Sequence, residues 1–257
     1  MQRFIIDVNK VVILFYLIIK FATQLLCNCE YRLMKHTIDR YLAKYIKYQF
    51  YYLLAAIVLF VIIPPFTLHL SFNAIIIHST VSFVIINCVI ILFENRKQVN
   101  FGYGILILTI AFTWFTMSPL LEGILIIKVI KSALLLVLFI ATAFKVISFI
   151  LKLKKVNAQV IAGSIATYLL FGLSGAMLFD MIDVLYPHSF KHSFNYGGGY
   201  DMVYFSFVTL STLGYGDITP HTPQGQAVAI LVSIVGQLYL AILMAMLVGK
   251  FLKDTDW

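Results

Sequence analysis

One stretch between two long apolar segments decides how the rest of the chain is interpreted. It reads Thr209-Leu210-Ser211-Thr212-Leu213-Gly214-Tyr215-Gly216-Asp217. Gly214 and Gly216 stand at alternate positions, where the absence of a Cβ atom permits positive φ angles that other residues resist. The stretch therefore predicts an extended backbone whose carbonyls can be turned toward one axis. A surface turn also uses Gly and Asp, but a turn does not require so long a motif between two apolar segments.

The composition indicates a membrane protein that crosses the bilayer several times. Of the 257 residues, 61% are hydrophobic and 12% are charged, whereas soluble domains carry about 25% charged residues. Three cysteines, Cys27, Cys29 and Cys88, are too few and too poorly spaced for a disulfide framework or a zinc site. No cofactor is therefore expected.

Apolar segments predict six membrane spans and one shorter helix. The six spans lie at about 51–63 (extended toward 70), 74–93, 104–117, 120–149, 157–186 and 224–252. Residues 201–211 predict a re-entrant helix that is too short to cross the membrane. Residues 11–26 predict a helix at the membrane interface, with an additional span as the second interpretation.

Residues 200–220 resemble the pore loop of the potassium-channel superfamily. They read Tyr-Asp-Met-Val-Tyr-Phe-Ser-Phe-Val-Thr-Leu-Ser-Thr-Leu-Gly-Tyr-Gly-Asp-Ile-Thr-Pro, and the nearest subgroup is that of small bacterial channels of the two-transmembrane-pore type. The resemblance implies an all-α membrane protein, built as a tetramer around one pore. Two features depart from the common pattern: Leu213 replaces valine, and Tyr204-Phe205 replaces a tryptophan pair.

The resemblance also implies how ions would be selected. Rings of backbone carbonyls replace the hydration shell of potassium in such filters. The expected filter residues are Thr212, Leu213, Gly214, Tyr215 and Gly216, with potassium held at Thr212, Leu213, Gly214 and Tyr215.

Four further residues have expected roles around the filter. Asp217, Tyr204 and Thr209 are expected to support it. We predict that the Tyr204 hydroxyl donates a hydrogen bond to Asp217, and the alternative is that the Tyr204 ring only packs. Gly236, inside the last span, is interpreted either as the hinge of a gate or as a site of close helix packing.

These features predict a potassium-selective channel that conducts passively, with potassium as the permeant species. The expected partners are three further copies of the chain and membrane lipids, without nucleic acid. A weakly selective cation channel is the alternative, should Leu213 or the altered pore helix loosen the filter. A multi-span enzyme is not expected, because the six histidines form no recognisable metal motif. An intact filter also argues against a regulatory subunit without a pore.

The expected domains are an N-terminal cytoplasmic or interfacial segment (1–48), a four-helix domain (49–155) and a pore domain (156–257). With the filter outside, thirteen of the 19 basic residues fall on the cytoplasmic side, as the positive-inside rule requires. They are Arg32, Lys35, Arg40, Lys44, Lys47, Arg96, Lys97, Lys145, Lys152, Lys154, Lys155, Lys250 and Lys253. This predicts a multi-pass protein of the plasma or inner membrane, with both termini cytoplasmic and no soluble regulatory domain after the last span.

The four-helix domain resembles a voltage-sensor domain that lacks most of its charges. Sensors space arginines at every third residue of the fourth span, where this chain has only Lys128 and Lys131. Each charge moved through the field contributes about 2.3 kcal/mol per 100 mV. We therefore expect weak or absent voltage dependence.

Overall fold

The computed structural model is almost entirely helical, with one pair of three-residue strands. It describes residues 31–67, 72–93, 99–116, 124–153, 157–192 and 200–254. The interfacial helix predicted at 11–26 lies outside these residues. By its internal contacts the chain divides into two compact units, Met1–Lys47 and Tyr48–Trp257.

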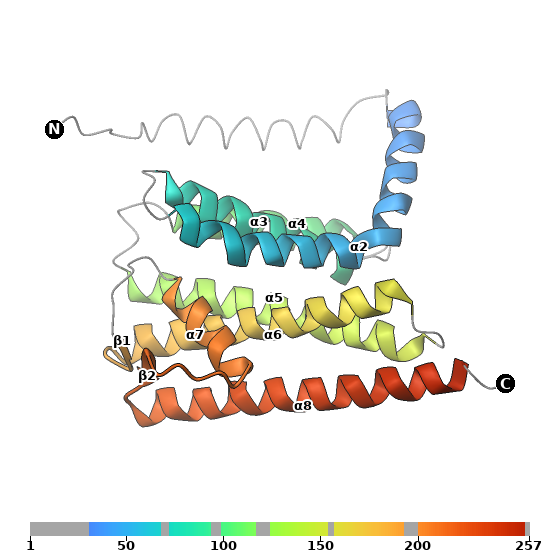
Figure 1. The fold of residues 1–257 in the computed structure, drawn as a ribbon. Helices are drawn as coiled ribbons and strands as arrows, with labels where there is room; N and C mark the ends of the chain where they lie inside the picture. The colour runs from blue at the N-terminus through green and yellow to red at the C-terminus, as the bar shows by residue number, and fades with distance from the viewer. Residues whose placement is uncertain are drawn as a thin grey trace. The chain divides into compact units, whose positions relative to one another are not determined.

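Helix α2 (Tyr31–Thr67) belongs to both units (Figure 1). Tyr48 has φ −118° and ψ 15°, so its backbone leaves the helical conformation and two helices meet there. The part from Tyr48 onward is apolar and contains Pro64 and Pro65 near its end. Prolines remove backbone donors from a helix interior, which leaves carbonyls one turn earlier without their usual partners.

Among the residues that the structure describes, five helices are long and apolar enough to cross a membrane. They are Tyr48–Thr67 of α2, α3 (Asn73–Leu92), α5 (Leu125–Lys152), α6 (Ala158–Leu185) and Pro223–Met246 of α8 (Pro223–Asp254). Helix α4 (Val99–Phe115) coincides with the third predicted span but has only 17 residues. Spans need about 20 residues, with a lower limit near 17, so α4 is at that limit.

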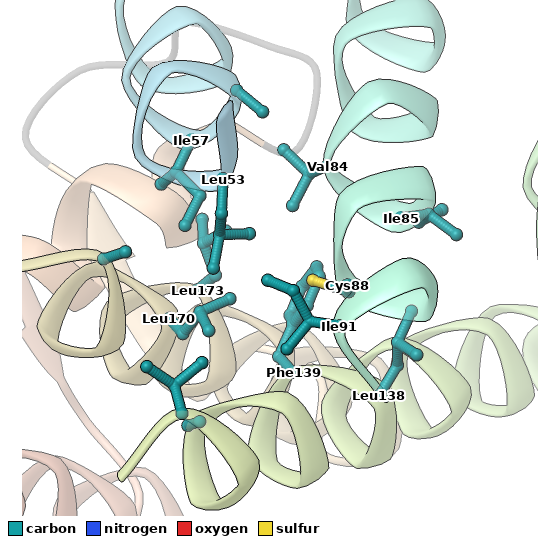
Figure 2. Packing of buried hydrophobic residues seen from close by; sticks show 14 of the residues in the cluster. Leu53, Ile57, Val84, Ile85, Cys88, Ile91, Leu138, Phe139, Leu170 and Leu173 are labelled. Carbon is teal, nitrogen blue, oxygen red and sulfur yellow. The ribbon is translucent and has the colours of Figure 1, made fainter. Parts of the chain in front are cut away.

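The main hydrophobic core joins α2, α3, α5 and α6 (Figure 2). Leu53 and Ile57 of α2, Cys88 of α3 and Leu170 and Leu173 of α6 are almost fully buried there. Such interiors are close-packed, and the loss of one large side chain costs about 2–5 kcal/mol. The core therefore connects the helices before residue 154 with the first helix of the predicted pore domain.

Helix α6 is the central element of the C-terminal half. It lies beside α5, the short helix α7 (Asp201–Leu210) and α8 (Figure 1). Asn157 caps its start, since the side-chain oxygen accepts a hydrogen bond from the Val160 N–H at 3.0 Å. The helix matches the span predicted at 157–186.

A second, smaller core packs around three aromatic rings at the other end of α6. Phe179 of α6, Phe190 of strand β1 (Phe190–His192) and Phe205 of α7 have ring centroids 4.7–5.5 Å apart. Ile218 of strand β2 (Ile218–Pro220) and Val232 of α8 complete it. This core fixes the segment between α7 and β2, which contains the predicted filter.

Candidate functional site: the pore loop

Helix α7 is seated on two glycines of α6. A Cβ atom on Gly172 would lie 2.3 Å from the Phe207 ring, and one on Gly175 would lie 2.4 Å from the Ser206 hydroxyl. Ser206 is fully buried and donates to the Gly172 carbonyl at 2.6 Å. Small residues allow helices in membranes to approach this closely. The ten residues of α7 are too few to cross a membrane, as the sequence predicts for the re-entrant helix.

The backbone after α7 alternates in conformation. Thr212, Gly214 and Gly216 have φ angles of +59°, +60° and +80°, whereas Leu213 and Tyr215 between them do not have positive φ. Glycine adopts positive φ angles freely, but a positive φ is energetically costly for threonine. The sequence predicts positive φ at the two glycines and misses Thr212, since threonine gives no signal for it. An alternating backbone of this kind can turn successive carbonyls toward one axis.

The start of this segment is tied back to the end of α7. The Thr212 N–H donates to the Thr209 carbonyl, and the Leu213 N–H donates to the Val208 carbonyl, both at 3.0 Å. Thr209, expected as a supporting residue, thus acts here through its backbone carbonyl. These two bonds fix where the extended segment begins.

Asp217 closes the segment and is held from two sides. The Tyr204 hydroxyl of α7 donates to one carboxylate oxygen, and the Ile218 N–H donates to the other at 2.9 Å. The predicted Tyr204–Asp217 hydrogen bond is therefore present. The phenol, with a further contribution from the backbone, lowers the pKa of the Asp217 carboxyl below its usual value. The carboxylate thus stays ionised beside Gly216, the last residue of the predicted filter.

Strand β1 pairs with the chain immediately after Asp217. The register is antiparallel, with Phe190 opposite Pro220, Lys191 opposite Thr219 and His192 opposite Ile218. The sequence does not predict this pair of strands, because three-residue strands leave almost no pattern. Among the described residues, no group of histidine, cysteine and carboxylate side chains could hold a metal.

Helix α8 approaches the base of the pore loop at Gly236. A Cβ atom there would lie 2.2 Å from the Leu210 carbonyl oxygen, at the end of α7. This contact supports the packing interpretation of Gly236, and a hinge at Gly236 remains a prediction. Three residues later, the Tyr239 hydroxyl donates to the Ser164 carbonyl of α6 at 2.8 Å. The sequence analysis does not identify Tyr239 as a residue of the site.

Within one chain, many side chains of the predicted filter segment and of α8 are exposed. Leu213 and Tyr215 are 55% and 67% exposed. Several large apolar residues of α8 are also about half exposed or more: Ile230, Leu231, Ile234, Leu238, Ile242 and Met244. Exposed apolar surface of this extent marks contact with protein or lipid.

Comparison with known proteins adds one finding. A protein-family model described as "Ion channel" matches residues 163–253, which run from α6 through the pore loop into α8. No curated protein and no solved structure matches the chain. The matched region contains two apolar helices joined by a short helix and an extended segment, and this arrangement is that of a two-helix pore domain. Residues 163–253 are therefore similar to a two-helix pore domain of the potassium-channel type, which is consistent with the potassium-channel superfamily.

Proposed function

We propose that the chain forms a potassium-selective channel that conducts potassium passively. The observation that carries the proposal is the positive φ at Thr212, Gly214 and Gly216 in the segment between α7 and β2. Backbone carbonyls at 212–216 would replace the water around the ion, as carbonyl rings do in such filters. Non-helical backbone at membrane depth is tolerated only where protein or a water-filled cavity surrounds it. The packing of α7 against α6 and α8 supports such a setting on one side, and further copies of the chain would supply the rest.

A homotetramer is the assembly that this filter needs. One chain supplies one extended segment, and a ring of carbonyls requires four around a common axis. The exposed rings of Tyr215 and the exposed apolar side chains of α8 support such assembly, because three further copies could cover them. Lipid would cover the remaining apolar surface.

The membrane arrangement in this proposal has six spans, with α4 as the third. The bias of basic residues toward one side supports cytoplasmic termini and an outward-facing filter, in a plasma or inner membrane. Voltage dependence would be weak or absent, because α5 carries only Lys128 and Lys131 in its first half.

Ion flux into liposomes that contain the purified protein tests this function. Under a potassium gradient we expect flux that exceeds the flux under a matched sodium gradient, and we expect Gly214→Ala to abolish it, because its φ of +60° is strained for alanine. Gly104→Ala is the matched control, since nothing lies within 4 Å of a Cβ atom there.

The same experiment separates the alternatives. Equal potassium and sodium flux would replace the proposal with a weakly selective cation channel. Flux that persists undiminished in Gly214→Ala would show that the ions pass elsewhere. Flux in neither gradient, from protein shown to be tetrameric, would contradict a constitutive pore.

A further inference from the structure

The first span ends with a backbone carbonyl that has no donor in its own helix. In an α-helix the carbonyl of residue i accepts from the N–H of residue i+4. Residue 65 is a proline and has no N–H. The Val61 carbonyl is therefore left without its helical partner. A buried carbonyl without a donor is costly.

A tyrosine of the pore loop supplies the missing donor to the Val61 carbonyl. The Tyr200 hydroxyl donates to the Val61 carbonyl, across 139 positions of sequence. Both residues are partly buried and pack against the main hydrophobic core. Burial raises the pKa of the Tyr200 phenol above its ordinary value, so the hydroxyl keeps its proton for this bond.

Tyr200 stands where α7 begins. It is the N-cap residue of α7, but its side chain makes no capping bond to that helix. Its carbonyl accepts from the Tyr204 N–H at 3.0 Å, so the two tyrosines are one helical turn apart. Tyr204 in turn donates to Asp217, directly after the filter. Two phenols, one turn apart on one short helix, thus bond to the first span and to the end of the filter.

We propose that Tyr200 is a positioning residue through which the end of the first span sets the position of the pore helix, and with it the filter. Pro65 leaves the Val61 carbonyl without a helical donor, so the Tyr200 hydroxyl is the donor that this carbonyl has. The proposal rests on the proposed function, since it assigns an effect on the potassium site. If the hydrogen bond from Tyr200 to the Val61 carbonyl only stabilised α2, its loss would not change potassium binding.

Four proteins separate these two roles: the parent, Tyr200→Phe, Pro65→Ala and the double variant. Tyr200→Phe removes the donor, whereas Pro65→Ala supplies an N–H in α2 that can donate to the same carbonyl. Two quantities are measured on detergent-solubilised full-length protein. One is the midpoint temperature of unfolding without potassium, and the other is the potassium concentration that gives half of the maximal thermal protection, which reports ion binding without an open gate.

The two quantities are expected to diverge. Tyr200→Phe should lower the midpoint temperature by several degrees and raise the half-protecting potassium concentration by up to about tenfold, as the loss of one hydrogen bond can. In the double variant the midpoint temperature should return close to that of the parent, because the N–H of residue 65 now donates to the Val61 carbonyl. The half-protecting potassium concentration should stay above that of the parent, because α7 still lacks its hydrogen bond to α2. Pro65→Ala alone should leave it close to that of the parent, because a carbonyl oxygen has two lone pairs and can accept from both donors.

Three results would overturn the proposal. The first is recovery of both quantities in the double variant, which would mean that Tyr200 only satisfies a carbonyl. The second is an unchanged potassium concentration in Tyr200→Phe. The third is the same response when Pro64→Ala replaces Pro65→Ala, because residue 64 would donate to residue 60 and not to Val61.

Failure of the proposed function has a different signature. A parent protein that potassium does not protect would contradict the potassium site itself and, with it, any effect of Tyr200 on that site. The midpoint temperatures of the four proteins would then still show whether Tyr200 and Pro65 act on one carbonyl.

Discussion

The hydroxyl groups of α4 and those of the helices α7 and α8 make different kinds of hydrogen bond. Thr109 and Thr113 of α4 donate to carbonyls four and three residues earlier in their own helix, at 2.7 and 2.8 Å. Ser206 and Tyr239 reach neighbouring helices instead. Bonds within a helix satisfy a polar group without fixing where the helix lies. Bonds between helices fix relative position, so the pore region is specified by polar contacts as well as by apolar packing.

The glycines of the two regions should show the largest difference. Gly236→Ala should destabilise the protein by about 1–3 kcal/mol, because the added carbon has to displace the Leu210 backbone from 2.2 Å. Gly104→Ala adds the same carbon in open space within α4 and should stabilise it by up to about 1 kcal/mol. Thermal unfolding in detergent checks both signs. Equal effects at the two positions would contradict a special contact between α8 and the pore helix.

The buried hydroxyls should show a smaller difference. Ser206→Ala should cost about 1–2 kcal/mol, because it removes a bond between α7 and α6. Thr109→Val should be close to neutral, since the Thr109 hydroxyl bonds only to the Ile105 carbonyl of α4 among the described contacts. The free energies of unfolding of the two variants, measured side by side, decide the matter. A larger loss in Thr109→Val would reverse the comparison.

The effect of Tyr204→Phe should depend on pH. The Tyr204 phenol lowers the pKa of Asp217, so the contribution of this bond is complete above the ordinary aspartate pKa of about 3.9 and is lost as the pH falls through the lowered value. In Tyr204→Phe the Asp217 pKa should rise toward its ordinary value.

Acid inactivation of potassium flux should then begin at a higher external pH in Tyr204→Phe than in the parent. Tyr103→Phe, at an exposed position of α4, serves as the control and should leave the pH profile unchanged. Flux and filter stability that are the same in Tyr204→Phe and the parent at every pH would rule out a supporting role for this bond.

The charges of α5 should have the smallest effect. Replacement of Lys128 and Lys131 by Gln should leave the conductance–voltage relation nearly flat, as in the parent, because few charges are available to move through the field. Recordings from planar bilayers measure this relation. A steep curve in the parent that becomes flat in the double variant would show that the helices before residue 154 do sense voltage.

The sequence predicted the helices well because their apolar segments are long. It placed α6 and the short helix α7 within a few residues of their observed ends. The third span was predicted at about 104–117, whereas α4 begins at Val99 and ends at Phe115. Apolar length alone does not define where a helix begins and ends.

The parts of the site that were missed depend on contacts between distant residues. Thr212 takes positive φ although threonine disfavours it, so its conformation is imposed by the surrounding chain. Strand β1 exists only through its pairing with β2. The bond from Tyr200 to Val61 follows from Pro65, yet the sequence does not show which donor would reach that carbonyl. The Tyr204–Asp217 bond was predictable because both residues belong to one local motif.

The length of α4 has a consequence for the surrounding lipid. Its 17 residues rise ~25 Å along the helix axis, which is less than the ~30 Å of a typical hydrocarbon core. The 28 residues of α5 exceed that thickness comfortably. As a span, α4 would therefore create a hydrophobic mismatch on one flank of the protein, and a bilayer relieves such mismatch by local thinning. Acyl-chain length would then influence this flank of the protein more strongly than the flank formed by the longer helices.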